Sequence, residues 1–236
     1  MEHMPESTNL TQWCFAWDPT DDPHAGNSKA ALVTKNKWGK GSTISVAFLD
    51  GEASVQQRIK DVLKAWTAPD TANLKVVFVN DSKKADVRIS FKHPGSWSTI
   101  GTSCRTVPKD QPSMNFGWLT PASSDQELRR VVLHEFGHAL GLIHEHQNPG
   151  GVIPWNKPNV YRDLGGPPNN WDKATIDHNM FEAYSKTETN YTAVDITSIM
   201  MYPIPASWVT DPKYAAGLNT DLSTQDKQFI HKQYPK

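Results

Sequence analysis

Hydrophobic positions in the first half of the chain predict a sheet with a helix packed on it. Apolar residues alternate with polar ones over 43–50, and β-branched side chains are frequent there, which is typical of a strand. A second strand is predicted over 74–80 and a third over 86–91, where Val87, Ile89 and Phe91 share one face. Between the first two strands, residues 51–66 repeat their apolar side chains at the spacing of an amphipathic helix. The order strand, helix, strand predicts a right-handed parallel unit.

The segment 112–119 also alternates, but its two faces differ in size. Met114, Phe116 and Trp118 share one face, whereas Asn115 and Gly117 share the other. A strand with a small, open face lets another backbone lie close to it. An ordinary edge strand explains the pattern equally well, so both interpretations stay open.

The second half of the chain is dominated by helical patterns and one irregular stretch. Ser124 stands three residues before Glu127, which is the spacing of a capping box at the start of a helix. Three segments have helical periodicity, namely 126–140, 172–184 and 222–234, the last capped by Ser223 or Thr224. Pro, Gly and Asn are frequent over 147–170, which predicts a long loop, and such loops are often functional.

The first forty residues show neither period, and we expect 1–40 to form an irregular N-terminal arm. Its aromatic residues are expected to pin the arm to the body of the protein. They are Trp13, Phe15, Trp17 and Trp38. The two cysteines of the chain, Cys14 and Cys104, are either free thiols or one disulfide between arm and body.

Charge and hydropathy exclude two classes of partner. The 236 residues include 24 basic and 25 acidic ones, interspersed and without a basic stripe, so no nucleic acid is expected. No apolar run approaches the ~20 residues of a membrane span, so no membrane partner is expected either. The first thirty residues also lack the apolar core of a secretory signal.

The helix predicted over 126–140 carries a candidate metal site. His134 and His138 are four residues apart, so their imidazoles leave the same face and can converge on one ion. Glu135 can place a carboxylate beside that ion, over a bound water, which is the H-E-x-x-H pattern with Glu as general base.

A third ligand must come from beyond the end of this helix. A catalytic zinc takes three protein ligands and keeps one open position, and a continuing helix would carry His144 away from the ion. Gly141 lies midway between His138 and His144, and glycine takes the left-handed turn that ends a helix. We therefore predict one catalytic Zn²⁺ bound by three histidines. His146 competes with His144 by proximity, but the spacing from Gly141 favours His144.

The motif H-E-x-x-H-x-x-G-x-x-H, followed by S-I-M-M-Y-P at 198–203, resembles the metzincin zinc peptidases. Glu145 directly after the third histidine, together with Ser198, Met200 and Tyr202, resembles the astacin branch, in its compact microbial form. The resemblance implies an α+β fold with a twisted mixed sheet and the active-site helix in an upper lobe, above an irregular, helix-containing lower lobe. One catalytic domain would span 41–236, with the lobes divided at about residue 141 into an upper part and a lower part, 142–236.

The resemblance also implies roles for individual residues. Met200 would form an apolar floor below the ligands, the Met-turn. Tyr202 would approach the metal as a movable ligand and then stabilise the oxyanion. The strand at 112–119 would be the rim that aligns an extended substrate, with Asn115 and Gly117 as substrate-binding residues. In mature astacins a trimmed N-terminus meets the glutamate after the third histidine; the long arm leads us to expect that Glu145 pairs with a nearby base or an arm residue instead.

The expected function is a monomeric zinc-dependent endopeptidase that hydrolyses proteins or peptides through a metal-activated water. The alternative is a latent or inactive peptidase-like zinc protein that binds peptides, and the thiolate of Cys14 is one candidate for a zinc cap. The resemblance implies secretion. The cleavage preference does not follow from the sequence.

Overall fold

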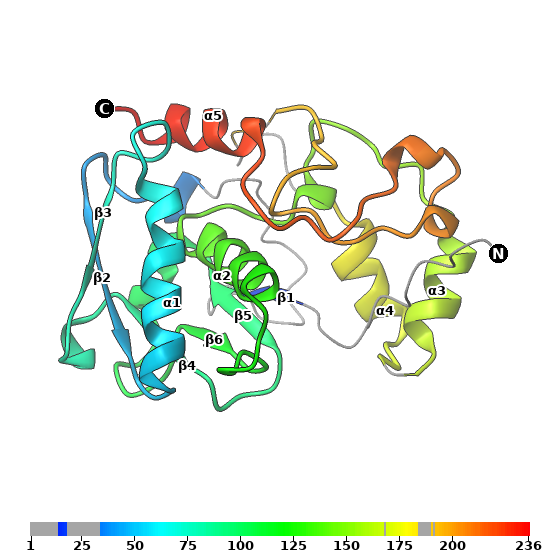
Figure 1. The fold of residues 1–236 in the computed structure, drawn as a ribbon. Coiled ribbons are helices and arrows are strands. Elements are labelled where there is room, and N and C mark those ends of the chain that lie inside the picture. Colours follow the sequence, from blue (N-terminus) through cyan, green and yellow to red (C-terminus); the bar gives the residue numbers. More distant parts are fainter. Residues whose placement is uncertain (1–13, 18–33, 168, 184–189, 191) are drawn as a thin grey trace.

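A computed structural model describes residues 14–17, 34–167, 169–183, 190 and 192–236, and it shows two lobes side by side (Figure 1). The strands are β1 (Cys14–Trp17), β2 (Thr43–Phe48), β3 (Lys75–Phe78), β4 (Val87–Ser90), β5 (Ser96–Thr99) and β6 (Met114–Phe116). The α-helices are α1 (Ala53–Leu63), α2 (Asp125–Ala139), α3 (Lys157–Gly165), α4 (Lys173–Ile176) and α5 (Thr224–Gln233).

The strands form one mixed sheet in the order β1-β5-β6-β4-β2-β3. β5 is antiparallel to β6, and the other neighbouring strands are parallel. The predicted parallel unit is confirmed, because β2 and β3 flank α1 in sequence and pair with Thr43 opposite Lys75. The α+β class with a mixed sheet is likewise confirmed.

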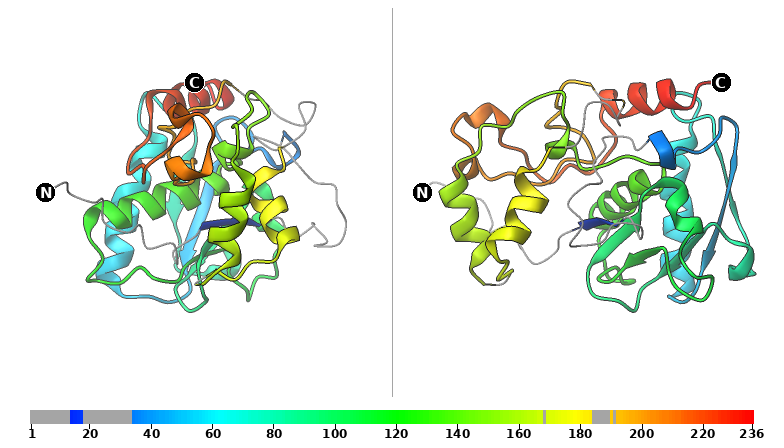
Figure 2. Two further views of the ribbon diagram at one scale, coloured as in Figure 1. Left: turned by 90° about the vertical axis from the view of Figure 1, so that its right-hand side faces the viewer. Right: turned by 180° about the vertical axis from the view of Figure 1, so that it is seen from behind.

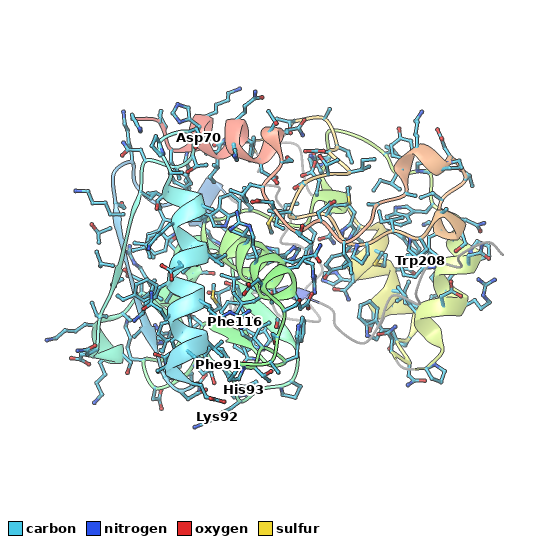
Figure 3. All side chains as sticks on the ribbon, in the orientation of Figure 1. Asp70, Phe91, Lys92, His93, Phe116 and Trp208 are labelled. Atoms are coloured by element: carbon cyan, nitrogen blue, oxygen red, sulfur yellow. The ribbon has the colours of Figure 1, made fainter. Side chains whose placement is uncertain are left out.

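The small face of β6 is filled by the protein itself. β6 lies inside the sheet, between β5 and β4, so the edge-strand interpretation is wrong. The buried Asn115 donates from Nδ2 to the carbonyl oxygens of His93 (2.9 Å) and Gly95 (2.6 Å), and a Cβ on Gly117 would overlap the same His93 oxygen. Figure 3 labels His93 and Phe116 in the same part of the first lobe, with Phe91 between their labels. The close backbone is therefore the turn at 93–95, and the substrate-binding roles of Asn115 and Gly117 stay a prediction.

The N-terminal arm contributes a strand, which the sequence did not predict. β1 pairs in parallel with β5, with Cys14 opposite Ser96 and Trp17 opposite Thr99. At the other end of the arm, the buried Trp38 donates from Nε1 to the carbonyl of Ala139 at 2.8 Å, which confirms its anchoring role. Trp13 lies outside the described residues.

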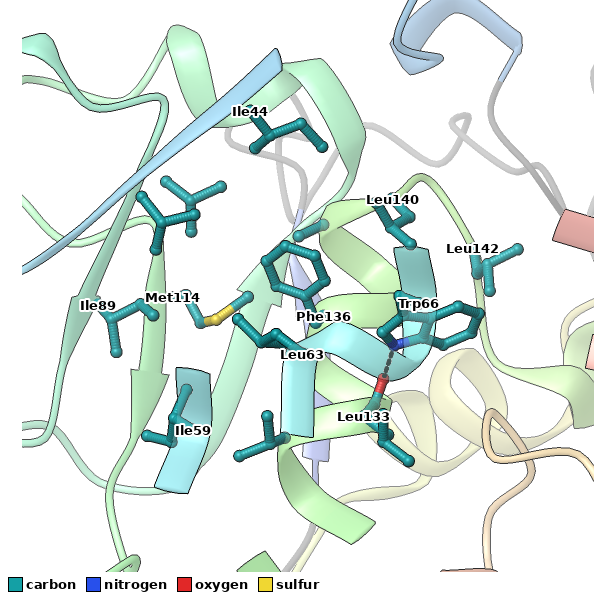
Figure 4. Close-up of a cluster of buried hydrophobic side chains, with 14 of the residues drawn as sticks. Ile44, Ile59, Leu63, Trp66, Ile89, Met114, Leu133, Phe136, Leu140 and Leu142 are labelled. Atoms are coloured by element: carbon teal, nitrogen blue, oxygen red, sulfur yellow. Dashed lines mark hydrogen bonds between the residues drawn. The ribbon is translucent and has the colours of Figure 1, made fainter. Parts of the chain in front are cut away.

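The first lobe has its core between the sheet and helices α1 and α2. Side chains from all three layers meet in this core, and Figure 4 shows them: Ile44, Ile89 and Met114 from strands, Ile59 and Leu63 from α1, and Leu133 and Phe136 from α2. The indole of Trp66, just after α1, donates to the carbonyl of Leu133 at 3.0 Å. This bond and the apolar contacts fix the position of α2 on the sheet.

The second lobe is built from α3, α4 and the segment 206–216 (Figure 2). The loop predicted over 147–170 is wrong in part, because α3 forms inside it. Val160 and Leu164 are four residues apart and pack against Trp208, which Figure 3 labels in this lobe. The helix predicted over 172–184 is α4 followed by the π-helical turn η6 (Asp177–Phe181).

The last helix, α5, returns to the first lobe. Ile230 and Tyr234 belong to the first core, and Tyr234 Oη donates to the carbonyl of Leu140 at 2.7 Å. Ser223 caps α5 in a capping box with Asp226, which selects Ser223 over Thr224.

In the described part of the chain, no helix is long and apolar enough to cross a bilayer.

Cys104 is a free, buried thiol, so the disulfide alternative is not realised. Burial raises the pKa of this thiol to about 12.

Candidate metal centre

Helix α2 begins at a capped end and carries two of the predicted ligands. Ser124 Oγ accepts a hydrogen bond from the backbone N–H of Glu127 at 3.2 Å. The carboxylate of Glu127 does not complete the predicted capping box. It accepts instead from Trp118 Nε1 (3.0 Å) and from the guanidinium of Arg130 (2.7 and 2.9 Å). The start of α2 is therefore tied to the end of the segment that follows β6.

The end of α2 has the turn that the sequence predicted. Gly141 has a φ of 100°, its N–H donates to the carbonyl of His138, and the N–H of Leu142 donates to the carbonyl of Gly137. These two bonds form the glycine-terminated helix end that reverses the chain direction. The reversal brings His144 back to His134 and His138, and one nitrogen from each ring lies within 4.8 Å of the other two.

Backbone carbonyls fix the tautomers of two of these rings. His134 Nδ1 lies 2.8 Å from the carbonyl oxygen of Ile199, and His138 Nδ1 lies 2.8 Å from that of Leu142. A carbonyl oxygen only accepts, so each Nδ1 carries the proton and each Nε2 presents a lone pair. A metal-binding imidazole needs this arrangement.

The spacing of the ring nitrogens fits zinc. His138 Nε2 and His144 Nε2 are 3.2 Å apart. Two nitrogens bound to one tetrahedral zinc at ~2.0–2.1 Å would lie ~3.4 Å apart. Burial is the main cause that lowers the pKa of His138 to about 4, and it lowers the pKa values of His134 and His144 as well. The three rings are therefore neutral at pH 7, as metal binding requires.

Glu135 follows the first ligand on α2 and is completely buried. Its backbone position is fixed by the helix that also holds His134 and His138. The candidate general base and two candidate ligands thus belong to one rigid element.

Met200 lies against α2 between the two helical ligands. Its side chain is 2% exposed, and a Cβ on Gly137 would overlap its sulfur. Gly137 was not singled out in the sequence, although a glycine inside a helix is unfavourable by about 1 kcal/mol relative to alanine, which was the available signal. Because Gly137 has no side chain, the Met200 side chain can approach the backbone of α2 beside the candidate ligands.

Tyr202 and His146 complete an aromatic group beside the ligands. The buried Tyr202 ring lies 4.2 Å from the His144 ring and 4.6 Å from the His146 ring, centroid to centroid. His146 Nε2 lies 2.7 Å from the carbonyl oxygen of Asn179 and therefore donates to it. His146 is not one of the three clustered ligands, which supports the choice of His144.

Glu145 does not pair with a base among the described residues. Its Oε1 accepts from Asn148 Nδ2 at 2.9 Å and from the N–H of Asp195 at 3.0 Å. Burial raises its pKa to about 7. The N–H of Glu145 donates to the carbonyl of Met200, which links the segment of the third histidine to the Met-turn.

Comparisons with known proteins agree with this geometry. No family model matches the chain. The zinc metalloproteinase nas-30 of Caenorhabditis elegans is 27% identical over 128 residues, which are 54% of this chain and only 15% of the nematode protein. A structure of myroilysin is 41% identical with a TM-score of 0.83, covering 87% of this chain and 98% of that one. A second myroilysin structure is 38% identical with a TM-score of 0.68, covering 97% and 93%. The chain belongs to the same family as myroilysin, within the metzincin zinc metallopeptidases.

Proposed function

We propose that this protein is an astacin-like zinc endopeptidase that binds one catalytic ion through His134, His138 and His144. The observation that carries the proposal is the convergence of three buried imidazoles, with one nitrogen of each within 4.8 Å of the other two and His138 Nε2 3.2 Å from His144 Nε2. His134 and His138 each present an Nε2 lone pair, because their Nδ1 atoms donate to backbone carbonyls, and the third imidazole completes a three-histidine set for one cation.

The chemistry assigns a role to each group around this set. A zinc ion held here supplies a bound water of lowered pKa and polarises a substrate carbonyl. Glu135 accepts a proton from the attacking water and delivers it to the leaving amine as the peptide bond breaks. The Tyr202 hydroxyl donates a hydrogen bond to the oxygen on which negative charge develops. Proteins and peptides are the substrates, and the active species is a monomer.

One observation favours a latent form of the same enzyme. β1 covers the outer edge of β5, and both strands pack against α2, which carries the ligands. An exposed sheet edge is where an extended peptide adds as a further strand. The arm therefore takes the position that a substrate strand would use, and its removal would activate the enzyme.

The test of the proposed function combines metal analysis with hydrolysis. The purified full chain should contain zinc at one equivalent by elemental analysis. It should cleave denatured casein, either directly or after its arm has been removed by limited proteolysis. A chelator should abolish cleavage, and added zinc should restore it. Cleavage that persists in the metal-free protein would overturn the proposal, as would a zinc-loaded, arm-free protein that cuts nothing.

A further inference from the structure

A chain of hydrogen bonds connects His134 to a carboxylate on α5, at the far end of the sequence. His134 Nδ1 donates to the carbonyl of Ile199, and the N–H of Met200, in the same peptide group, donates to Ser198 Oγ at 3.0 Å. Ser198 Oγ donates in turn to Asp226 Oδ1 at 2.7 Å. All the donors point the same way, so the chain runs from the imidazole to the carboxylate.

The same carboxylate also holds the preceding peptide group. Asp226 Oδ2 accepts from the N–H of Ile199 at 2.8 Å and from the N–H of Ser223 at 2.9 Å. Asp226 is only 7% exposed, so these donors replace the water that an aspartate would otherwise bind. Two consecutive peptide groups of the Met-turn are thus oriented by one side chain.

This support matters because the Met-turn has no regular structure. Residues 198–201 belong to no helix or strand, so no ladder of backbone bonds orients the Ile199 carbonyl. The carbonyl must nevertheless meet His134 Nδ1 at a fixed angle for Nε2 to face the other two ligands. An N–H that donates to a well-placed acceptor also strengthens its own carbonyl as an acceptor.

We propose that Asp226 is a positioning residue of the metal site, which sets the orientation and tautomer of His134 through Ser198 and the Ile199–Met200 peptide. The proposal deepens the proposed function, because it concerns one of the same three ligands. Partners of metal-bound histidines contribute to affinity, and their loss typically weakens metal binding by 10–100-fold. Here the carboxylate acts through a hydroxyl and a peptide group instead of contacting the imidazole.

The competing explanation is that Asp226 only caps α5. Its N–H donates to Ser223 Oγ at 2.9 Å in the capping box, so its replacement could act through helix stability alone.

Three variants of the full chain separate the two explanations. Asp226→Asn removes the charge and replaces one accepting oxygen by a donor. Ser198→Ala interrupts the series of hydrogen bonds between His134 and Asp226 but leaves the Ser223 cap of α5 intact. Ser223→Ala removes the cap hydroxyl, and with it a bond to Asp195, but keeps the Asp226 carboxylate.

The measurement is the zinc dissociation constant at pH 7, by competition with a chromophoric chelator, on variants whose fold is checked by circular dichroism. We expect zinc binding to weaken about 10–100-fold in Asp226→Asn, to weaken in Ser198→Ala, and to stay unchanged in Ser223→Ala. The NMR signal of the His134 Nδ1 proton should shift in the first two variants only. If Asp226→Asn does not fold, Ser198→Ala alone decides the result.

Two results would overturn the proposal: unchanged zinc affinity in Asp226→Asn and Ser198→Ala, or equal weakening in Ser223→Ala. Casein hydrolysis by the wild-type protein is measured separately. A protein that binds zinc without cleaving casein contradicts the proposed endopeptidase, while the affinity ratios still decide the role of Asp226. A wild-type protein that binds no zinc contradicts both.

Discussion

Glu135 lies on the same buried turn as the first ligand, and its carboxylate is not needed to hold the metal. We expect Glu135→Gln to retain zinc at one equivalent and to lose turnover by roughly 10²–10⁴-fold, the usual contribution of a general base. The amide keeps the shape of the side chain but cannot accept the proton. The rate is measured with a fluorogenic peptide and the metal by elemental analysis. A variant that cleaves as fast as the parent would remove Glu135 from the mechanism.

Gly137 is a residue of the site whose size is tightly constrained. A methyl group there would overlap the Met200 sulfur and press on Trp66 at 3.2 Å, and both side chains are buried. Overpacking of this kind costs about 1–3 kcal/mol, which exceeds the helix propensity gain of about 1 kcal/mol. We therefore expect Gly137→Ala to lower the free energy of unfolding and to weaken zinc binding.

Gly217 provides the matched control for this substitution, because a Cβ there meets no atom within 4 Å. In urea titrations, Gly217→Ala should unfold at the same midpoint as the parent, whereas Gly137→Ala should unfold earlier. Equal midpoints for both variants would show that Met200 moves aside at no cost.

At the residue scale, the candidate metal ligands could be predicted from the sequence, but the residues that position them could not. His134, His138, Gly141 and His144 lie within eleven residues, so helix geometry and one glycine turn determine how they meet. The role of Gly137 depends on Met200, and that of Asp226 depends on the turn at 198–200. Those contacts join distant parts of the chain, and no local spacing reveals them.

At the scale of secondary structure elements, β1 is a strand that the sequence did not predict, and its effect on proteolysis can be tested. It covers the edge of β5, so a chain that begins at residue 34 should expose that edge to extended peptides. We expect this truncated protein to cleave denatured casein faster than the full chain, because the substrate no longer competes with the arm. Trp38 remains in it and keeps its bond to Ala139.

Cys14→Ser in the full chain tests whether the arm acts through its thiol. An increase in rate equal to that of the truncated protein would assign latency to the thiol, and no increase would assign it to strand pairing. A truncated protein no faster than the full chain would mean that the arm does not inhibit.

The sequence predicted the strands β2, β3, β4 and β6 but missed β1 and β5, which lie together at one edge of the sheet. β2 and β4 alternate apolar and polar residues and β3 is mostly apolar, whereas β5 is a four-residue strand with Ser at positions 96 and 98, and β1 lies in a polar arm. The helix α3 was missed because Pro, Gly and Asn surround it, although Val160 and Leu164 had the right spacing. Tertiary packing, rather than local preference, forms these elements.

At the scale of the whole molecule, Glu145 couples folding to pH. Its folded pKa of about 7 lies above the ordinary value of 4.5, so the folded state binds more protons between these values. Its contribution to stability is fully present below about pH 4.5 and is lost as the pH rises through about 7. The buried histidines have lowered pKa values, and their contribution changes in the opposite direction, lost as the pH falls below 6.5.

Glu145→Gln isolates the glutamate, because the variant keeps every histidine. In the metal-free protein, the stability of the parent relative to the variant should fall by about 3 kcal/mol from pH 4.5 to pH 7, at about 1.4 kcal/mol per pKa unit. Urea unfolding at several pH values measures this difference. A constant difference would mean that Glu145 titrates equally in both states.

The burial of Cys104 makes this protein convenient to follow in solution. A thiol with a pKa of about 12 in a closed core does not react with maleimides at neutral pH while the protein is folded. The sequence has only one other cysteine, so any dye would attach at position 14, within the arm. A dye at this position makes the arm observable in the same sample as proteolysis, without any engineered mutation.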